Sequence, residues 1–219
     1  MNRKIGIWMM LLGLLLLLSA GGLLMYNSYE DERAGAAARE QLALLVSRIE
    51  ENKEEEEGIS GSADHRQELP QEQWFQEILT QPPGEEEEPL PTMAADSDGY
   101  IGYISMPTID IELPIMSDWD YDKLLRSPCY YFGTVETEDL VLMAHNYTRH
   151  FGKLSLLDPG DPVYFVDIQG VTTQYVVVHQ EILPPKCVPE LTNGNFDLTL
   201  FTCTYSGANR VTVRCDRVE

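Results

Sequence analysis

The segment FDLTLFTCTYSGANRVTVRC, at residues 196–215, decides the fold of this chain. Two runs within it, at 196–202 and 210–215, are rich in Thr, Val, Leu and Phe, and a turn-like string containing Ser, Gly and Asn separates them. This pattern predicts two antiparallel strands joined by a hairpin. Cys203 follows the first strand and Arg210 opens the second, so we expect a rigidly held, accessible thiol with a cation opposite it. Such a cation favours the thiolate or binds an oxyanion formed on a substrate.

A second strand end carries His145, which follows the apolar run LVLMA at 140–144. Histidine exchanges protons near neutral pH, so a histidine at the mouth of a strand can act as a general acid or base. A fixed histidine and a fixed cysteine provide the geometry that nucleophilic catalysis requires. Taken singly, each residue also has an ordinary interpretation, as a buried apolar cysteine, a hydrogen-bonded histidine or a solvated arginine.

Short apolar runs alternate with turn residues from Gly99 to Glu219. Seven of these runs have the length and composition of strands, with breaks at proline and glycine. The predicted strands are Tyr100–Ser105, Ile109–Ile115, Leu140–Ala144, Val163–Ile168, Thr173–His179, Phe196–Thr202 and Arg210–Cys215. Short helices are predicted at Asp120–Arg126 and Phe151–Leu157. So many short strands indicate an all-β barrel or sandwich, with residues 99–219 as one domain.

The N-terminus contains an uncharged, leucine-rich run from Ile5 to Met25. A helix of this length rises about 30 Å, the thickness of a hydrocarbon core. Arg3 and Lys4 precede the run and acidic residues follow it, so residues 1–29 are expected to form a cytoplasmic tip and a transmembrane anchor. We therefore predict a single-pass plasma-membrane protein with an extracellular domain. The alternative is a signal peptide cleaved near the small residues at 19–22, but the run exceeds the usual apolar length of such peptides.

Residues 30–98 connect the anchor to the domain. Residues 30–57 are rich in alanine and place apolar side chains at helical spacing, which predicts a stalk helix too brief to specify a coiled coil. Beyond it, up to residue 98, glutamate runs at 54–57 and 85–88 and five prolines predict an extended, self-repelling linker. A short amphipathic helix is suggested only by the apolar residues Trp74, Phe75, Ile78 and Leu79.

The net charge of the sequence is −21, from 36 acidic and 15 basic residues. Residues 30–98 hold 20 of the acids and 5 of the bases, so this connecting region carries most of the negative charge. No basic patch is large enough to hold a phosphate backbone, which argues against nucleic-acid binding. An acidic chain is also repelled by anionic headgroups, so any membrane attachment must be hydrophobic.

Several ordered motifs resemble those of sortases, the cysteine transpeptidases of the Gram-positive cell surface. TLFTC at 199–203 followed by Arg210 resembles the family's TLxTC strand end with an arginine on the next strand, and AHNY at 144–147 resembles its histidine motif. GYISMPTIDIELPIM at 102–116 resembles the opening pair of strands. HFGKLSLL at 150–157 resembles the segment that follows the histidine in class B-like members. The resemblance covers residues 99–219.

The resemblance implies an eight-stranded β-barrel of the sortase type and a cysteine transpeptidase or peptidase activity. In this family the cysteine attacks a Thr–Gly-type bond of an LPxTG-like sorting signal. An amine of a peptidoglycan precursor or of a pilin then resolves the thioacyl enzyme. By motif match, Cys203 is the nucleophile, His145 the acid/base, and Arg210 the group that stabilises the oxyanion or positions the substrate. No cofactor or metal is implied, although some sortases are stimulated by calcium.

Three features depart from the family pattern. The histidine motif begins with Ala144, where glycine is frequent. The gap before Arg210 is short, so Arg214, four residues later and on the same strand face, is a competing candidate. We favour Arg210 because it lies at the strand start, opposite the nucleophile. A lid of the pilin-polymerising type has its nearest match at Asp118–Trp119, but the residues that follow indicate an ordinary helix.

The remaining cysteines and histidines receive structural interpretations. The three cysteines are Cys129 in a packed loop, Cys187 on a loop over the barrel, and Cys215 closing the final strand. A disulfide among them is left open, because the chain is not small and cysteine-dense. The histidines are His65 in the linker, His150 close enough in sequence to approach the site, and His179 at a strand end.

Four other kinds of protein fit the sequence less well. An L,D-transpeptidase should show a Ser-His-Gly-Cys string, which is absent, and a papain-like amidase places its cysteine before its histidine. An inactive barrel acting as a surface binding module is disfavoured by the intact set of three residues. A structural stalk protein would leave residues 99–219 unexplained.

Overall fold

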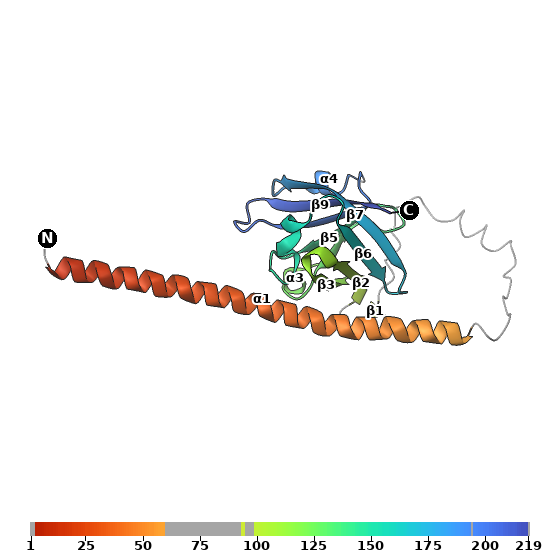
Figure 1. Ribbon diagram of the computed structural model, residues 1–219, viewed down its shortest axis with the longest axis horizontal. Coiled ribbons are helices and arrows are strands. Elements are labelled where there is room, and N and C mark those ends of the chain that lie inside the picture. The colour runs from red at the N-terminus through yellow and green to blue at the C-terminus, as the bar shows by residue number, and fades with distance from the viewer. Residues whose placement is uncertain (1–2, 60–92, 95–98, 194, 219) are drawn as a thin grey trace, which may run out of the picture.

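The computed structural model describes residues 3–59, 93–94, 99–193 and 195–218. A single long helix, α1 (Arg3–Ile59), runs beneath a β-barrel formed by the C-terminal half of the chain (Figure 1). The predicted linker between them, including the suggested helix around Trp74, lies largely outside the described residues. The chain therefore consists of a helical arm and one barrel, and the barrel carries the candidate residues.

Eight strands close the barrel. In the order of their pairing they run β2, β3, β4, β5, β8, β9, β7 and β6, and β6 pairs back with β2. Their bounds are β2 (Gly99–Met106), β3 (Ile111–Met116), β4 (Cys129–Phe132), β5 (Leu140–Ala144), β6 (Pro162–Asp167), β7 (Thr172–Leu183), β8 (Leu198–Cys203) and β9 (Arg210–Arg217). A two-residue strand, β1 (Met93–Ala94), adds a short pair to β2. The predicted eight-stranded barrel is confirmed.

The barrel interior follows from the alternation of side chains along each strand. Leu140 and Leu142 of β5 and Leu198 and Leu200 of β8 are fully buried in one apolar core. The segment after β5 forms a 3-10 helix, η2 (Phe151–Leu156), which contributes two further side chains to that core. The strands that carry the candidate residues are thus anchored by buried leucines.

The short helices agree with the sequence patterns, apart from their length. The helix predicted at 120–126 is α3 (Tyr121–Leu124), and the side chain of Asp120 caps it by accepting a hydrogen bond from the Lys123 amide. The helix predicted at 151–157 is η2. Two further short elements are η1 (Pro107–Ile109), a 3-10 turn, and α4 (Val188–Leu191), which follows Cys187.

One predicted loop is a strand. Residues around Cys129 were expected to form a packed loop, but β4 pairs antiparallel with β5 and meets β3 at the single pair Met116–Cys129. A bulge between Tyr130 and Phe132 shortens the regular part of this strand. So short a strand cannot be predicted from the strand propensities of its residues alone. Strand β7 also continues to Leu183, beyond its predicted end, because β9 pairs with it along that length.

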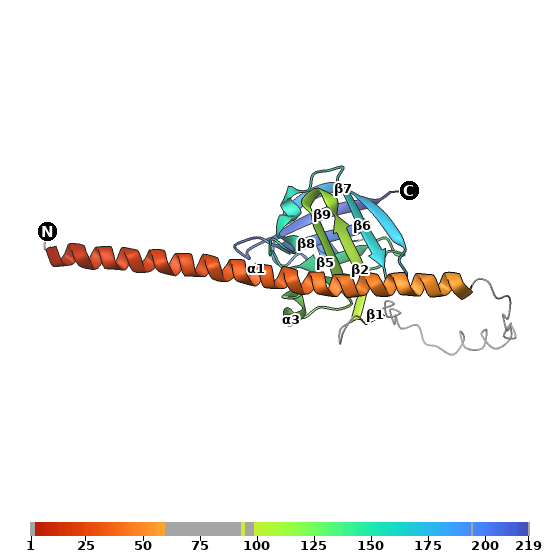
Figure 2. The ribbon, with the colours of Figure 1, turned by 60° about the horizontal axis from the view of Figure 1, so that its bottom comes forward.

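The predicted stalk region is helical, but it lies against the barrel. Ala34, Ala38, Leu45 and Ile49 are buried along one side of α1. Ala38 joins the barrel core, while Leu45 and Ile49 pack in a cluster with Tyr100 of β2 and other residues. Figure 2 shows the C-terminal half of α1 crossing the barrel, with its N-terminal half extending beyond it. The anchor and the barrel are therefore joined by packing as well as by the connecting chain.

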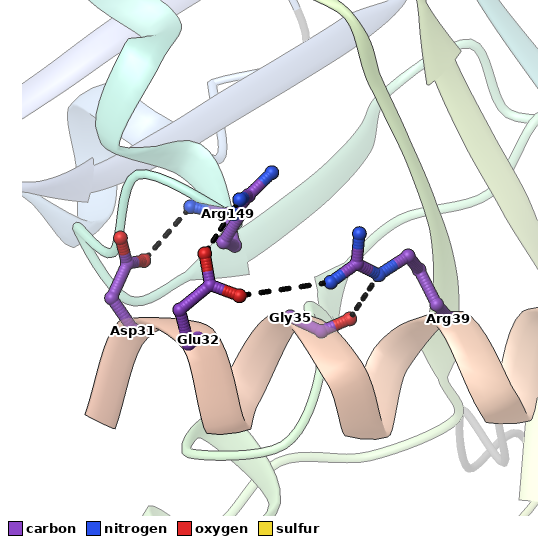
Figure 3. A network of polar contacts seen from close by, with 5 residues as sticks. All are labelled: Asp31, Glu32, Gly35, Arg39 and Arg149. Carbon is purple, nitrogen blue, oxygen red and sulfur yellow. Dashed lines mark hydrogen bonds and ion pairs between the residues drawn. The ribbon is translucent and has the colours of Figure 1, made fainter. Parts of the chain in front are cut away.

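Polar contacts hold α1 at two places. Near its middle, the Arg149 amide donates to the Asp31 carboxylate at 2.9 Å and the Arg149 guanidinium pairs with Glu32 at 2.6 Å (Figure 3). Gly35 lets Arg149 approach the helix closely. Near the C-terminal end of α1, the Lys53 ammonium donates to the Gly170 carbonyl at 2.7 Å.

The N-terminal half of α1 is long and apolar enough to cross a membrane. Its side chains from Trp8 to Met25 are exposed and make no apolar core with the barrel. The 57 residues of α1 rise about 85 Å at 1.5 Å per residue. One continuous helix thus includes both the apolar span and the segment that packs on the barrel.

Gly35→Val is expected to separate α1 from the loop that carries Arg149. A Cβ at position 35 would lie 2.7 Å from the Cβ and Cγ of Arg149, so the two backbones must move apart. Overpacking of this kind costs on the order of 1–3 kcal/mol, and we expect amide hydrogen exchange at helix residues 31–42 to accelerate by about tenfold. Gly22→Val is the matched control, because a Cβ there meets nothing within 4 Å. Unchanged exchange in Gly35→Val would contradict the packing described.

Candidate active site

Two neighbouring strands bring the candidate catalytic residues to one edge of the barrel. β5 and β8 are parallel, and Ala144 at the end of β5 is paired with Thr202 of β8. Parallel strands in register end at the same edge. His145 directly follows β5 and Cys203 ends β8, so both emerge there. The Thr202 hydroxyl donates to the Ala144 carbonyl at 2.8 Å and holds the two strand ends in this register.

Arg210 lies directly across the β8–β9 pair from Cys203, in the register expected from the sequence. Cross-strand partners project from the same face of a sheet. The guanidinium donates to the carbonyls of Gly207 at 3.3 Å and Asn209 at 3.2 Å, both in the hairpin between the strands. Because these bonds are exposed to solvent, a substrate oxyanion can replace the carbonyl acceptors at little cost.

The imidazole of His145 is partly buried and under-bonded. Burial lowers the pKa of His145 below its ordinary value, so the neutral form that can accept a proton predominates at pH 7. Its Nε2 atom is buried and has no hydrogen-bond partner within the part of the chain that the structure describes. An imidazole nitrogen without a partner can accept a proton from a group that comes within hydrogen-bond distance of it.

Two tyrosines contact the imidazole. Tyr121 of α3 meets it edge-on with ring centroids 5.8 Å apart, and Tyr147 lies at 5.2 Å. Neither tyrosine had a role predicted from the sequence, because Tyr121 belongs to a helix remote in sequence and the short motif does not indicate how Tyr147 is oriented. Together they limit the movement of the His145 ring.

The segment Asp118–Trp119 makes its contacts outside the reacting residues. Asp118 pairs with Lys123 of α3, and the Trp119 ring lies 6.4 Å from that of Tyr131 on β4. Both contacts fit the interpretation of this segment as the approach to an ordinary helix.

An apolar surface lies beside Cys203 on the outer face of the sheet. Tyr131, Phe132 and Met143 are partly exposed and pack on a small buried cluster. The cluster contains Val141, Leu183, Cys187, Leu191 and Phe201. A peptide whose carbonyl reaches the thiol can place apolar side chains on this surface.

The comparisons with known proteins identify the family. The family model described as the sortase domain matches residues 104–218, more than half of the chain. The chain belongs to the sortase family.

Sortase A of Bacillus anthracis is 26% identical over 117 residues, which make up 49% of this chain and 54% of that protein. The chain thus matches about half the length of this curated relative. The structure of sortase C1 from Streptococcus suis has 27% identity and a TM-score of 0.48, covering 55% of this chain and 73% of that one. The match with the structure of a Clostridium perfringens sortase D5 transpeptidase covers 84% of this chain and 99% of that one, with a TM-score of 0.55. Because the identity is 14%, this likeness concerns the fold alone.

In this sortase the second arginine stabilises the barrel. Arg214 is buried, and its Nε donates to the Glu181 carboxylate at 2.8 Å. Its two terminal nitrogens donate to the Thr199 hydroxyl at 2.9 Å and to the Glu190 carbonyl at 2.6 Å. Since protein acceptors engage all three nitrogens of Arg214, Arg210 is the arginine more accessible to a substrate.

All four cysteines of the sortase lie in the described residues and are free thiols. Cys129, Cys187 and Cys215 are buried, whereas Cys203 is partly exposed. Burial raises the pKa of Cys129 to about 12 and also raises the pKa values of Cys187 and Cys215, so these three thiols stay protonated at pH 7. No group of three His, Cys, Asp or Glu side chains that could hold a metal ion occurs among the described residues.

His150 shares a loop with His145 but is fully buried. Its ring packs on Tyr147, with centroids 5.5 Å apart. Burial lowers the pKa of His150 to about 4, and the neighbouring His145 acts in the same direction while Asp31 opposes it. A buried neutral imidazole serves the packing of this loop rather than proton transfer at the surface.

Arg214→Ala is expected to destabilise the sortase by about 2–3 kcal/mol, because Glu181 and the other acceptors lose a buried donor. Arg210→Ala, whose bonds are exposed, should change the free energy of unfolding by less than about 0.5 kcal/mol. Urea denaturation of the two variants in detergent measures both values. A larger loss for Arg210→Ala would reverse the roles assigned to the two arginines.

His150 should make the stability depend on pH. Its pKa is near 6.5 in the unfolded chain and about 4 in the folded one, so stability is fully present above pH 6.5 and declines as the pH falls towards 4. The expected loss between pH 7.5 and 4.5 is on the order of 2–3 kcal/mol. In His150→Gln this loss should shrink, whereas His179→Gln should retain it. Equal losses in His150→Gln and the unaltered chain would contradict the assignment.

Proposed function

We propose that this sortase is a membrane-anchored transpeptidase that cleaves an LPxTG-like sorting signal and joins the protein bearing it to an amine. The observation that carries the proposal is the register of three strands. Cys203 and His145 end a parallel pair at one edge, and Arg210 faces Cys203 across the next pair. A thiol, an imidazole nitrogen without a partner in the described residues and a guanidinium at this edge supply a nucleophile, a proton carrier and an oxyanion donor.

In the first half-reaction the Cys203 thiol gives its proton to His145, and the sulfur attacks the carbonyl carbon of a Thr–Gly-type bond. Arg210 donates to the oxyanion of the tetrahedral intermediate. The C–N bond then breaks as His145 returns the proton to the leaving amine. The products of this step are a thioester on Cys203 and the released C-terminal part of the signal.

In the second half-reaction an acceptor amine attacks the thioester. His145 removes a proton from the attacking nitrogen, the C–S bond breaks, and the sulfur recovers a proton as the new amide forms. Water in place of the amine gives hydrolysis. These steps call on no metal or cofactor.

The substrate and the acceptor follow from the family and from the surface beside the thiol. The Leu and Pro of a sorting signal suit the apolar surface formed by Tyr131, Phe132 and Met143. The acceptor is an amine of a peptidoglycan precursor or of a pilin.

The proposed location is the plasma membrane. Residues 5–25 of α1 form the single span, the basic residues before it remain in the cytoplasm, and the barrel is extracellular. The helix is long and apolar enough for this role.

Cys203→Ala is expected to abolish transpeptidation, and His145→Ala to slow it on the order of 10²–10⁴-fold. The assay uses the full chain in nanodiscs with LPxTG-like and NPxTG-like peptides, with and without an added amine. Cys187→Ala is the matched control, because its thiol is buried and should not be needed for turnover. Arg210→Ala should lower turnover more than Arg214→Ala when rates are expressed per folded molecule.

Two results would contradict the proposal. Turnover by purified Cys203→Ala would show that Cys203 is not the nucleophile. A loss below about tenfold in His145→Ala would show that another residue carries the proton. Alkylation with iodoacetamide separates an inactive barrel from an enzyme, because a live nucleophile should be modified at Cys203 before the three buried thiols.

A further inference from the structure

The continuous helix α1 determines how far the active site can lie from the membrane. If residues 5–25 fill the hydrocarbon core, Asp31 lies six residues beyond Met25, a rise of about 9 Å. The headgroup layer of one leaflet is roughly 5–8 Å thick. Helix residues 26–32 therefore pass through the headgroups and reach their outer edge.

The loop that carries His145 is fastened to α1 at this height. Asp31 and Glu32 bind the backbone and the side chain of Arg149, four residues after His145. Closer still to the span, Tyr147 lies near Glu30 and Tyr26; its pKa is raised by burial first and by these neighbours second. Because the Tyr147 and His145 rings are 5.2 Å apart, the imidazole also lies close to the part of α1 that follows the apolar run.

The most exposed aromatic side chains of the barrel lie at this same end. Among the described residues, Trp119 is 50% exposed, Tyr121 73% and Tyr205 91%. Trp119 and Tyr121 follow β3, whose end is paired with the start of β4, and Tyr205 lies two residues after Cys203. In Figures 1 and 2 the hairpin between β8 and β9 extends toward the N-terminal half of α1. Tyr26 and Tyr29 of α1 are exposed as well.

We propose that the barrel end carrying Cys203 and His145 rests on the headgroup layer, with Tyr121 and Tyr205 in contact with lipid headgroups. Tyrosine and tryptophan favour this zone, where the ring is partly dehydrated and its polar atom stays wet. Acidic side chains at the same end, including Asp120, Asp122 and Glu30, make neutral or zwitterionic headgroups the preferred surface. Groups presented at the membrane surface can thus reach this end of the barrel. This inference rests on the proposed membrane span and does not require the proposed chemistry.

The opposite end of the barrel supplies a matched comparison. Val171 is exposed in the turn between β6 and β7, where Gly170 accepts a hydrogen bond from Lys53. Lys53 lies 28 residues beyond Met25, a rise of about 42 Å, so Val171 should stay far from lipid even if the helix tilts by about 20°.

Fluorescence quenching of the full chain in phosphatidylcholine vesicles tests the inference. In a Cys203→Ala background, an environment-sensitive NBD label is attached to Tyr205→Cys or to Val171→Cys, and lipids with a nitroxide on the headgroup act as quenchers. We expect about half or more of the fluorescence to be lost at position 205 and less than about a tenth at position 171. Equal quenching at the two positions would overturn the inference.

A third labelled position separates this inference from the anchor on which it rests. Leu15→Cys should be quenched by lipids with a nitroxide on the acyl chain. Quenching at position 15 without preferential quenching at position 205 would support the membrane span and contradict the contact of the barrel with the headgroups. No quenching at position 15 would contradict the membrane span and therefore also the inference that rests on it.

A helical insertion tests whether α1 sets the height. Eleven residues inserted between Tyr29 and Glu30 add about three turns and about 16 Å while nearly preserving the helix face. Quenching at position 205 should then fall to the level at position 171. Undiminished quenching would overturn the role of α1 as the spacer.

Discussion

The parallel pairing of β5 with β8 is the constraint on which the candidate site depends. Parallel neighbours require a long crossover, and the chain between them builds η2, β6 and β7 before it returns to β5. One ladder of backbone hydrogen bonds thereby places two sequence-distant strand ends side by side. A slip of one residue would turn Cys203 to the other face of the sheet. The buried leucines that determine the register therefore also determine on which face Cys203 lies.

Three arginines around this ladder differ in their burial and in their partners. Arg214 is enclosed and bonded to Glu181, and an acceptor at each of its three nitrogens offsets the cost of its desolvation. Arg210 stays near solvent, bonded to carbonyls that a substrate can displace. Arg149 connects the histidine loop to the anchor helix through Asp31 and Glu32. Their different burial explains why one guanidinium group stabilises the barrel, one docks the helix, and Arg210 is the one available for the proposed reaction.

The strand pattern was sufficient for a barrel or sandwich and for the hairpin that pairs Cys203 with Arg210, because short strands and a tight connection are local signals. The eight-stranded barrel itself was predicted from the motifs that resemble those of sortases. It was insufficient for β4, whose four residues become a strand only through β3 and β5. The docking of α1 on the barrel was not predicted either. In the sequence, Gly35 and Ala38 indicate only that the segment is helical, and their role in close packing is visible only once the barrel surface is known. Tyr121 had no local signal at all, and only folding brings it to His145. Patterns within one element were thus predictable, and contacts between remote elements were not.

The position of β9 between β7 and β8 has a consequence for biogenesis. The strands up to β8 precede β9 in the chain, and until β9 forms, β7 and β8 each have a ladder edge without a partner. Such edges invite pairing with other polypeptides. Pairing of residues 210–217 closes both edges at once and places Arg210 opposite Cys203 in the same event. The surroundings of Cys203 are therefore complete only after β9 has paired.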